Sequence, residues 1–354
     1  MAFWKIANTN ICGIAGAVPD NSVDNYDLDI FTAEESQTFV DTVGIKRRYA
    51  APEHICASDL CLAAAEKLIN ELSWQKESID ILVFESVTRD FRTPPTSCIL
   101  QEKLGLSENC FTLDLPMGCC GFMYGLTIVS NLIQKGTARR ALLLVGDTAT
   151  RMGSPKDKSR VPLFGDCGVA IALEFDEQAQ PIKVDFHTDG KGHKALITPH
   201  SEFRQPVTPD SFEYKDFGCG IIRRPVDSLI DGMEVFSFAI SKPVKSIQQF
   251  METHNIHKDN DVNYFLIHQA NKLIIDRIVK KLKLPKNRVP SNLEEYGNTG
   301  GASIPMLFIT QIRDHAQTSP LSLLLSSFGL GLTWGTMWIE TKPMVIPELI
   351  KLKI

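Results

Sequence analysis

Apolar residues occur along this 354-residue chain in two kinds of run, which polar segments separate. Short, nearly continuous apolar runs predict buried strands, at residues 6–17, 79–86, 141–146, 168–174 and 262–267. Longer runs with helical spacing predict helices, at residues 58–72, 96–104, 120–134, 236–254 and 271–284. Strands that alternate with helices indicate an α/β protein whose sheets are well covered.

Residues 316–339 carry no charged side chain, a pattern that also suits a membrane-spanning segment. Several serines and glycines interrupt this stretch, however, and a continuous apolar helix would not contain them at that density. We therefore expect two short buried strands, 321–326 and 332–339, joined by a glycine turn, and no membrane span. The polar stretch 189–224, which contains several prolines and glycines, is expected to be mostly loop.

One segment combines this pattern with reactive chemistry. Asp114-Leu-Pro-Met-Gly-Cys-Cys-Gly-Phe122 places a cysteine between a predicted buried strand and a predicted core helix. A thiol at the start of a helix faces the positive end of the helix dipole, which lowers the thiol pKa and favours the thiolate. The alternative is a structural cysteine, because buried cysteines are common.

Two later segments add partners for such a thiol. A predicted buried strand runs directly into His268, and a glycine-rich loop before another helix carries Asn298. Taken separately, His268 could cap a strand and Asn298 could occupy a turn. A cysteine, a histidine and an asparagine, each at the end of an apolar strand or in the loop after it, form a set suited to thiol chemistry.

Composition narrows the class of protein. A net charge of −5 with 22% charged residues is typical of a soluble enzyme and argues against general nucleic-acid binding. The first residues, Met-Ala-Phe-Trp-Lys-Ile, lack the basic start and long apolar run of a signal peptide. The nine cysteines are irregularly spaced, with neither a disulfide framework nor paired zinc knuckles. We expect a cytoplasmic protein without a metal site.

In their order and spacing, the motifs of this chain resemble those of the ketoacyl synthase III family (beta-ketoacyl-[acyl-carrier-protein] synthase III) of the thiolase superfamily. The resemblance covers nearly the whole chain, and no single motif carries it. The matching segments are residues 44–48, 114–122, 145–147, 164–170, 232–236, 268–271, 297–299 and 328–335.

The resemblance implies an α/β thiolase-like fold, with two similar halves stacked as five layers αβαβα. Residues 1–178 would form the half that carries the cysteine, and residues 179–354 the half that carries the histidine and the asparagine. No internal repeat is visible in the residues themselves, so the duplication rests on the resemblance. The usual twofold homodimer of this fold is the expected oligomer.

The resemblance also implies a role for each site residue. Cys119, five residues after Asp114, would be the nucleophile rather than Cys120. His268 and Asn298 would hold the second thioester's carbonyl oxygen as it becomes an enolate. The backbone N–H groups of Cys119 and Gly331 would form the other oxyanion hole.

The implied reaction is a decarboxylative Claisen condensation of a Cys-bound acyl group with malonyl-acyl carrier protein, which needs no cofactor. Three alternatives stay open. The acyl group could pass to an alcohol or amine, with His268 as general base. The chain could be a chalcone-synthase-like polyketide enzyme, or a non-catalytic partner subunit. Asn298 favours condensation, because an enolate uses that donor more than an alcohol does.

Further residues bear on partners and specificity. The basic run that includes Lys272, Arg277, Lys280 and Lys281 would dock an acidic acyl carrier protein, although a solvated helix face has the same composition. By resemblance, Thr93 takes the place of the partner subunit's aromatic residue that closes the acyl tunnel. A threonine there leaves room for a longer or branched chain.

Two more positions concern the acyl donor. By resemblance, Thr38 and Thr42 take the places of a tryptophan and an arginine that hold the adenine of coenzyme A, whereas Phe39 would face elsewhere. Neither threonine offers a ring or a cation. We therefore predict that acyl-carrier protein is preferred over coenzyme A as donor.

Overall fold

Two mixed sheets form the centre of the protein, seen in a computed structural model that describes residues 2–133 and 137–353. The first sheet has the strand order β17-β2-β8-β7-β5-β6 and the second β1-β9-β16-β15-β14. The strands of the first sheet are Ile350–Leu352 (β17), Thr9–Pro19 (β2), Cys167–Phe175 (β8), Arg140–Asp147 (β7), Ile81–Glu85 (β5) and Phe111–Leu115 (β6). Those of the second are Ala2–Ile6 (β1), Ile182–Thr188 (β9), Thr333–Thr341 (β16), Leu321–Gly329 (β15) and Tyr264–Ile267 (β14).

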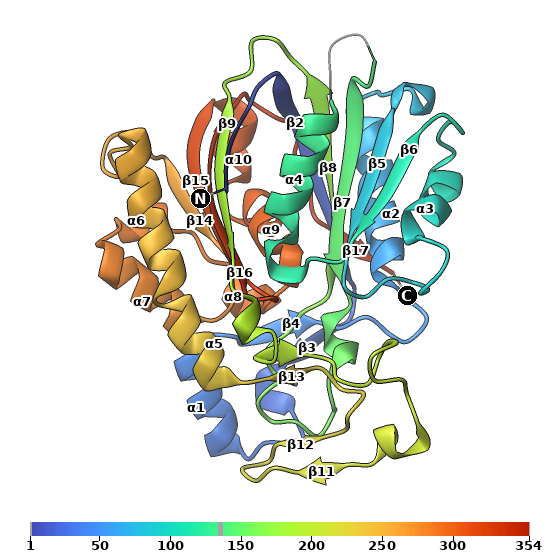
Figure 1. Cartoon of the computed structure of the whole chain (residues 1–354), viewed down its shortest axis with the longest axis vertical. Helices are drawn as coiled ribbons and strands as arrows, with labels where there is room; N and C mark the ends of the chain where they lie inside the picture. Colours follow the sequence, from blue (N-terminus) through green and yellow to red (C-terminus); the bar gives the residue numbers. More distant parts are fainter. Residues whose placement is uncertain (1, 134–136, 354) are drawn as a thin grey trace.

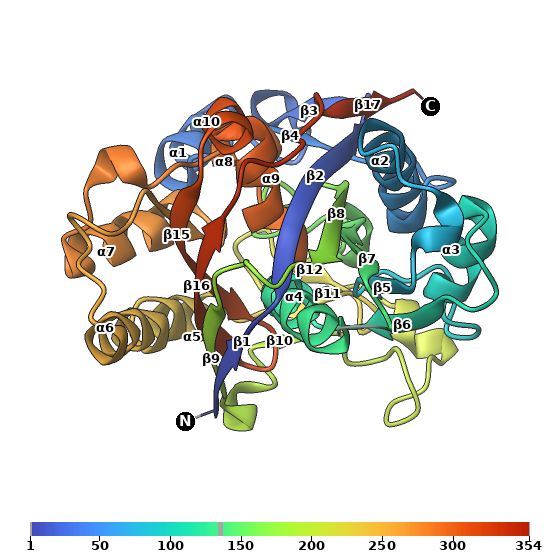
Figure 2. The same cartoon turned by 90° about the horizontal axis from the view of Figure 1, so that it is seen from above.

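Helices cover both faces of both sheets, which gives five layers (Figures 1 and 2). The helices α4 (Gly121–Leu132) and α9 (Ser303–Thr310) lie between the sheets. Outside the first sheet lie α2 (Ala57–Glu71) and α3 (Thr96–Leu104), and outside the second lie α6 (Lys242–His254) and α7 (Lys272–Leu282). The predicted layered α/β thiolase-like architecture is therefore confirmed.

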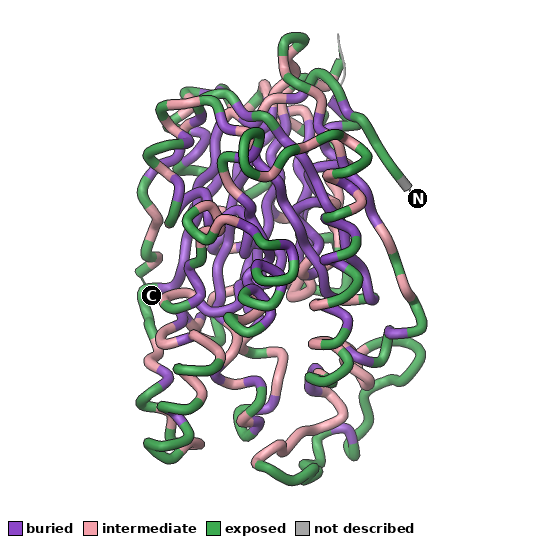
Figure 3. The backbone as a smooth tube through the Cα atoms, turned by 90° about the vertical axis from the view of Figure 1, so that its left-hand side faces the viewer, coloured by how far each residue is buried: buried purple, intermediate pink, exposed green. Residues whose placement is uncertain are grey.

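Alternating side chains along the strands explain this layering. On β7, Leu143 and Val145 pack in the central cluster that holds Phe122 of α4, whereas Leu142 and Leu144 pack in the cluster that holds α2 residues. Successive side chains of a strand point to opposite faces, so a strand that is apolar on both faces needs a helix layer on each. Figure 3 shows the buried residues gathered in the upper, central part of the molecule, where the sheets lie.

A lobe below the sheets is less buried (Figure 3). It holds α1 (Ala33–Val43), which starts at a capping box between Thr32 and Glu35, and the excursion between β9 and α5 (Gly232–Ala239). The excursion is mostly loop, as predicted. Its strands have two residues each: Leu196–Ile197 (β10), Lys215–Asp216 (β11), Ile222–Arg223 (β12) and Leu229–Ile230 (β13).

Most predicted elements are present, and two are divided differently. The predicted helix 236–254 is two helices, α5 and α6, because Pro243 lies in the first turn of α6 and lacks the N–H that a continuous helix needs. The predicted strand 6–17 is also two strands, separated around Asn8, whose φ of 66° is left-handed. The uncharged stretch 316–339 forms the antiparallel pair β15–β16, as predicted.

The first and the last strand of the chain each join the sheet that is formed mainly by the opposite half of the sequence. β1 pairs with β9 in the second sheet, and β17 pairs with β2 in the first. The expected boundary at 178/179 falls between β8 of the first sheet and β9 of the second. The end of the predicted helix 120–134 lies outside the described residues. No helix in the described part of the chain is long and apolar enough to cross a membrane.

Candidate active site

Cys119 lies in a single 3₁₀ turn, Gly118–Cys120, immediately before α4. Gly118 makes this turn possible: its φ is 59°, and a Cβ there would overlap the Leu330 side chain. The preceding strand, β6, is a half-exposed edge strand rather than the buried strand that the sequence suggested. The cysteine therefore stands at a helix start, as expected, but at the edge of its sheet.

The two adjacent cysteines point to different places. Cys119 lines a cavity of about 920 Å³, together with His268 and Asn298. Cys120 is fully buried, and its Sγ lies 3.5 Å from the Thr333 carbonyl oxygen. Only the first thiol faces the space in which the histidine and the asparagine meet it.

Apolar side chains make most of the cavity wall, and they come from separate parts of the chain. Phe39 and Val43 come from α1, and Leu273 and Ile274 from α7. The remaining large apolar residues of the wall are Leu163, Phe164, Leu196, Phe217, Ile221, Leu229, Ile230, Met233, Val235, Phe236, Phe238 and Phe328. The lobe below the sheets thus supplies much of the wall. Cys119 and His268 come from the turns that follow β6 and β14, and Asn298 comes from the loop that follows α8 (Leu293–Tyr296).

Burial dominates the electrostatics of the nucleophile. It raises the pKa of the Cys119 thiol to about 12, and the carboxyl groups of Asp147 and Glu85 act in the same direction when they are ionised. The backbone N–H groups of Leu330 and of Cys119 itself lower the pKa, but by less. The expected net lowering by the helix start is therefore wrong for the protein without substrate, because desolvation outweighs the dipole.

His268 follows directly after β14 and is buried as a neutral ring. Burial lowers its pKa to about 4. Its Nδ1 lies 2.7 Å from the Ser303 hydroxyl, which also accepts the Gln269 N–H at 3.4 Å. The Ser303 hydrogen is then free for Nδ1, so we assign the ring proton to Nε2, the nitrogen left for the cavity.

Ser303 was not foreseen from the sequence. It is the first residue of α9, five residues after Asn298, and only its packing against His268 reveals its role. Asn298 is oriented in a similar way, since its Oδ1 accepts the Gly300 N–H at 3.0 Å. That bond leaves the Asn298 amide N–H₂ for the cavity. Each side-chain donor is thus held by one neighbour.

The backbone donors at the sulfur differ from the prediction. The N–H group that lowers the pKa of the Cys119 thiol by a backbone hydrogen bond belongs to Leu330, one residue before the expected Gly331. A Cβ on Gly329 would lie 2.5 Å from the Cys119 Cβ, so the glycine that permits close approach is Gly329. Beyond Gly331 the chain already turns away, because Leu332 exchanges backbone hydrogen bonds with Asp189.

The other predicted residues lie on the surface. Lys272, Arg277, Lys280 and Lys281 are exposed on α7; Lys272 pairs with Asp276, and Lys281 donates to the Ile240 carbonyl at 2.8 Å. Thr93 is exposed in the loop between β5 and α3 and is not among the described residues that line the cavity of its own chain.

Three residues of α1 bear on the predicted acyl donor, and one of them lies in an unexpected place. Thr38 and Thr42 are exposed and do not belong to the described cavity wall. Phe39, which was expected to face elsewhere, does line the cavity. The expectation that α1 offers the cavity no aromatic ring is therefore wrong.

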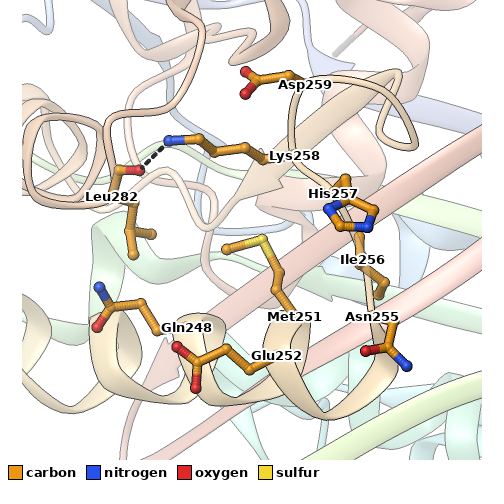
Figure 4. Close-up of a pocket in the computed structure, with 9 residues that line it drawn as sticks. All are labelled: Gln248, Met251, Glu252, Asn255, Ile256, His257, Lys258, Asp259 and Leu282. Carbon is orange, nitrogen blue, oxygen red and sulfur yellow. Dashed lines mark hydrogen bonds between the residues drawn. The ribbon is translucent and has the colours of Figure 1, made fainter.

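A second cavity, of about 460 Å³, lies where α6 and the segment after it approach the end of α7 (Figure 4). Its lysine, Lys258, donates to the Leu282 carbonyl oxygen at 3.1 Å. None of the residues shown there is a cysteine, so this cavity offers no thiol chemistry. Within residues 2–133 and 137–353, no group of three or more His, Cys, Asp or Glu side chains is arranged to hold a metal ion.

Comparisons with known proteins agree with this geometry. Residues 113–190 match the model of the 3-oxoacyl-[acyl-carrier-protein] synthase III family, and residues 252–341 match that of its C-terminal domain. The beta-ketoacyl-[acyl-carrier-protein] synthase III of Clostridium perfringens strain SM101 is 33% identical over 94% of this chain and 99% of its own length. The enzyme of that name from Lactococcus lactis strain IL1403 is 30% identical over 96% and 100%.

Solved structures give the same result. A 3-oxoacyl-(acyl-carrier protein) synthase from Burkholderia xenovorans LB400 superposes with a TM-score of 0.92 at 36% identity, covering 100% of this chain and 99% of that one. The 3-oxoacyl-(acyl carrier protein) synthase III of Pseudomonas aeruginosa PAO1 has a TM-score of 0.82 at 27% identity, covering 96% and 99%.

Proposed function

The chain belongs to the 3-oxoacyl-[acyl-carrier-protein] synthase III family, and on that premise we propose that it is a condensing enzyme. It joins an acyl group held on Cys119 to malonyl-acyl carrier protein and yields a 3-oxoacyl thioester. The observation that carries the proposal is a single cavity lined by a thiol and two side-chain donors, Cys119, His268 and Asn298.

The first half-reaction loads the enzyme. The Cys119 sulfur attacks the carbonyl carbon of an acyl thioester, and the developing oxyanion accepts hydrogen bonds from the N–H groups of Cys119 and Leu330. The donor's C–S bond then breaks, and the proton from the Cys119 thiol leaves with the donor's thiol. We propose Leu330 as the second backbone donor in place of Gly331, because it is the N–H that already acts on the sulfur.

The second half-reaction forms the carbon–carbon bond. The malonyl C–CO₂ bond breaks, and the resulting enolate oxygen accepts hydrogen bonds from His268 Nε2 and the Asn298 amide. The enolate carbon attacks the acyl carbonyl carbon, the bond to Cys119 breaks, and the thiolate takes up a proton. Two N–H donors suit this step, because each remains neutral while negative charge develops on the oxygen.

The low pKa of His268 argues against acyl transfer to an alcohol or amine. That reaction needs a base that accepts a proton near neutral pH. A ring with a pKa of about 4 and its Nδ1 occupied by Ser303 is a weak base. A non-catalytic subunit would not require two separately oriented donors at a thiol.

The proposal extends to partners. The exposed Arg277 and Lys280 lie on α7, the helix whose Leu273 and Ile274 reach the cavity wall, so a carrier protein docked there would face the site. We propose a homodimer in which the exposed Thr93 reaches the partner's acyl tunnel. A cytoplasmic location and the division into halves at 178/179 belong to the same proposal.

Mass spectrometry tests the proposal. Cys119 should gain the mass of the acyl group after incubation with acyl thioesters, and malonyl-acyl carrier protein should then release carbon dioxide and remove that mass. Cys120→Ser is the matched control and should label normally. An acylated protein that loses its acyl group to alcohols but never releases carbon dioxide would show that the transferase alternative is right.

The donor needs its own comparison. We expect faster labelling of Cys119 from acyl-carrier protein than from the matched acyl-coenzyme A, because Thr38 and Thr42 offer neither a ring nor a cation. Phe39→Leu is the control: if Phe39 stacks on adenine, this variant slows labelling from coenzyme A alone. Equal rates from both donors in the wild type would contradict the expectation.

A further inference from the structure

A buried acid beneath the reactive residues has no role in the mechanism above. Glu85 is the last residue of β5 and is 0% exposed. Neither of its carboxyl oxygens accepts a well-formed hydrogen bond from the described residues, although the Gly118 and Met117 N–H groups lie near enough to act on the carboxyl group. A buried polar group without a partner destabilises the fold, and such groups in native proteins are often functional.

Two glycines mark the place of this carboxyl group. A Cβ on Gly121 or on Gly301 would overlap the Glu85 carboxyl. Gly121 lies two residues after Cys119, and Gly301 lies three residues after Asn298. The carboxyl group therefore occupies the space between the turn that carries the nucleophile and the loop that carries the enolate donor.

A second acid supports the same loop from the neighbouring strand. Asp147 ends β7, which pairs with β5, and its Oδ1 accepts hydrogen bonds from Val87 N at 2.8 Å and from Ser86 Oγ at 3.0 Å. A Cβ on Gly300 would lie 2.9 Å from Asp147 Oδ2. Unlike Glu85, Asp147 has hydrogen-bond partners, so Glu85 is the unusual member of the pair.

The surroundings of Glu85 favour its neutral form. Burial and then the negative charge of Asp147 raise its pKa well above the usual value, against weaker effects of the Gly118 and Met117 N–H groups. The other titratable groups on which Glu85 acts are the thiols of Cys61, Cys119 and Cys120, all of them acids. Within the described part of the chain, no positively charged group is among the causes that shift the Glu85 pKa.

We propose that Glu85 is a positioning residue: a neutral carboxylic acid wedged between the Cys119 turn and the Asn298 loop, which holds them at the separation that condensation needs. This inference rests on the proposed function. A Cβ on Gly301 would crowd both Glu85 Oε2 and the Gly118 carbonyl oxygen, so the carboxyl group and the Cys119 turn pack against the Asn298 loop at the same point. Its neutrality also protects the nucleophile, because a charge on Glu85 disfavours the Cys119 thiolate.

Two substitutions separate shape from charge. Glu85→Gln keeps a neutral planar group of the same size, so kcat should stay within about threefold of the wild type. Glu85→Ala empties the space between the two loops, and kcat for condensation should fall about 100-fold, as small misplacements of reacting groups allow. The KM for malonyl-acyl carrier protein should change little in either variant, because Glu85 does not line the cavity wall.

A thiol assay provides a readout that a purely structural role would not move. The rate at which iodoacetamide alkylates Cys119 is measured from pH 7 to 10, and it needs no substrate. Glu85→Gln should react at the wild-type rate at pH 7, because both side chains are neutral there. Any excess in its rate at higher pH measures the charge that wild-type Glu85 has gained and that opposes the thiolate. Asp185→Asn, a change at a buried acid in the second sheet, is the control and should leave this profile unchanged.

Three results would overturn the proposal. These are a Glu85→Gln variant that loses as much activity as Glu85→Ala, a Glu85→Ala variant that keeps the wild-type kcat, and an alkylation rate of Glu85→Gln that already exceeds the wild-type rate at pH 7. If Glu85→Ala does not fold, the other variant and the alkylation profile still decide. A wild type that releases no carbon dioxide refutes the condensing function alone, because the alkylation comparison stands without it.

Discussion

The two halves of the proposed active site offer hydrogen-bond donors of different kinds. At Cys119 the donors are backbone N–H groups, those of Leu330 and of Cys119 itself. On the opposite side they are the side chains of His268 and Asn298, each oriented by one further residue. Side-chain donors can be removed by single substitutions, whereas backbone donors can only be displaced. Acyl loading should therefore depend on backbone geometry, and enolate formation on side chains.

The largest effect is expected at the nucleophile, which both half-reactions use. Cys119→Ala should abolish acylation and condensation, because no other thiol lines the cavity in the described structure. Cys120→Ala should keep most activity, since Cys120 points to Thr333 instead. Acyl adducts are measured by mass spectrometry. A dead Cys120→Ala variant together with an unlabelled Cys119 would show that the thiol assignment is reversed.

The side-chain donors should separate the two half-reactions. His268→Ala and Asn298→Ala should still take an acyl group on Cys119 but should lose carbon dioxide release by about 100- to 1000-fold, the usual effect of removing one preorganised donor. Single-turnover assays that follow each half-reaction give the comparison. Normal product formation by either variant would contradict an enolate-stabilising role.

Acyl loading, which depends on the backbone donors, should respond to a substitution that adds one methyl group. Gly329→Ala would bring a Cβ to 2.5 Å from the Cys119 Cβ and 2.7 Å from its Sγ, which the turn cannot accommodate without moving. Acylation should slow about 100-fold. Gly190→Ala is the control, as its Cβ would meet no atom within 4 Å. A Gly329→Ala variant that is acylated at the wild-type rate would contradict the importance of close backbone approach at Cys119.

A smaller effect is expected one step away from the donors. Ser303→Ala removes the hydrogen bond to His268 Nδ1, so the ring can place its proton on either nitrogen. A lost hydrogen bond is worth about 1 kcal/mol, which predicts roughly a fivefold slower release of carbon dioxide with acylation unchanged. Ser303→Thr should recover part of the loss, because it restores the hydroxyl. Slower acylation in Ser303→Ala would contradict this prediction, because the effect would then lie in the first half-reaction rather than in the second.

A further effect concerns the stability of the fold at low pH rather than the rate of either half-reaction. His268 has a pKa of about 4 in the folded protein against an ordinary value of 6.5, so the unfolded chain binds a proton first as the pH falls. Below about pH 6.5 the wild type should therefore lose up to about 1.4 kcal/mol of unfolding free energy per pH unit, until the folded ring is also protonated near pH 4. Urea unfolding at pH 7 and pH 5 measures this loss. His268→Gln lacks the linkage, so its unfolding free energy should fall by less.

The pattern of apolar residues was enough to predict the ends of several elements. The helix α3 has the predicted limits, Thr96–Leu104, and β14 leads into His268 as expected. These predictions depend on local periodicity, which is written in consecutive residues. Periodicity alone did not separate α5 from α6 or β1 from β2. Those breaks are marked by particular residues, Pro243 in the first turn of α6 and Asn8 in a left-handed conformation.

The sequence by itself determined the layered α/β architecture and the residue types at the reactive positions, Cys119, His268 and Asn298. Only the tertiary structure decided which groups surround them. Leu330 rather than Gly331 acts on the sulfur, Ser303 orients the histidine, and Glu85 lies beneath both loops. Glu85, Cys119 and Leu330 come from distant parts of the chain, and their side-chain directions follow from how whole layers pack. Local periodicity carries no information on that packing, because it specifies which face of an element is buried and not what lies against it.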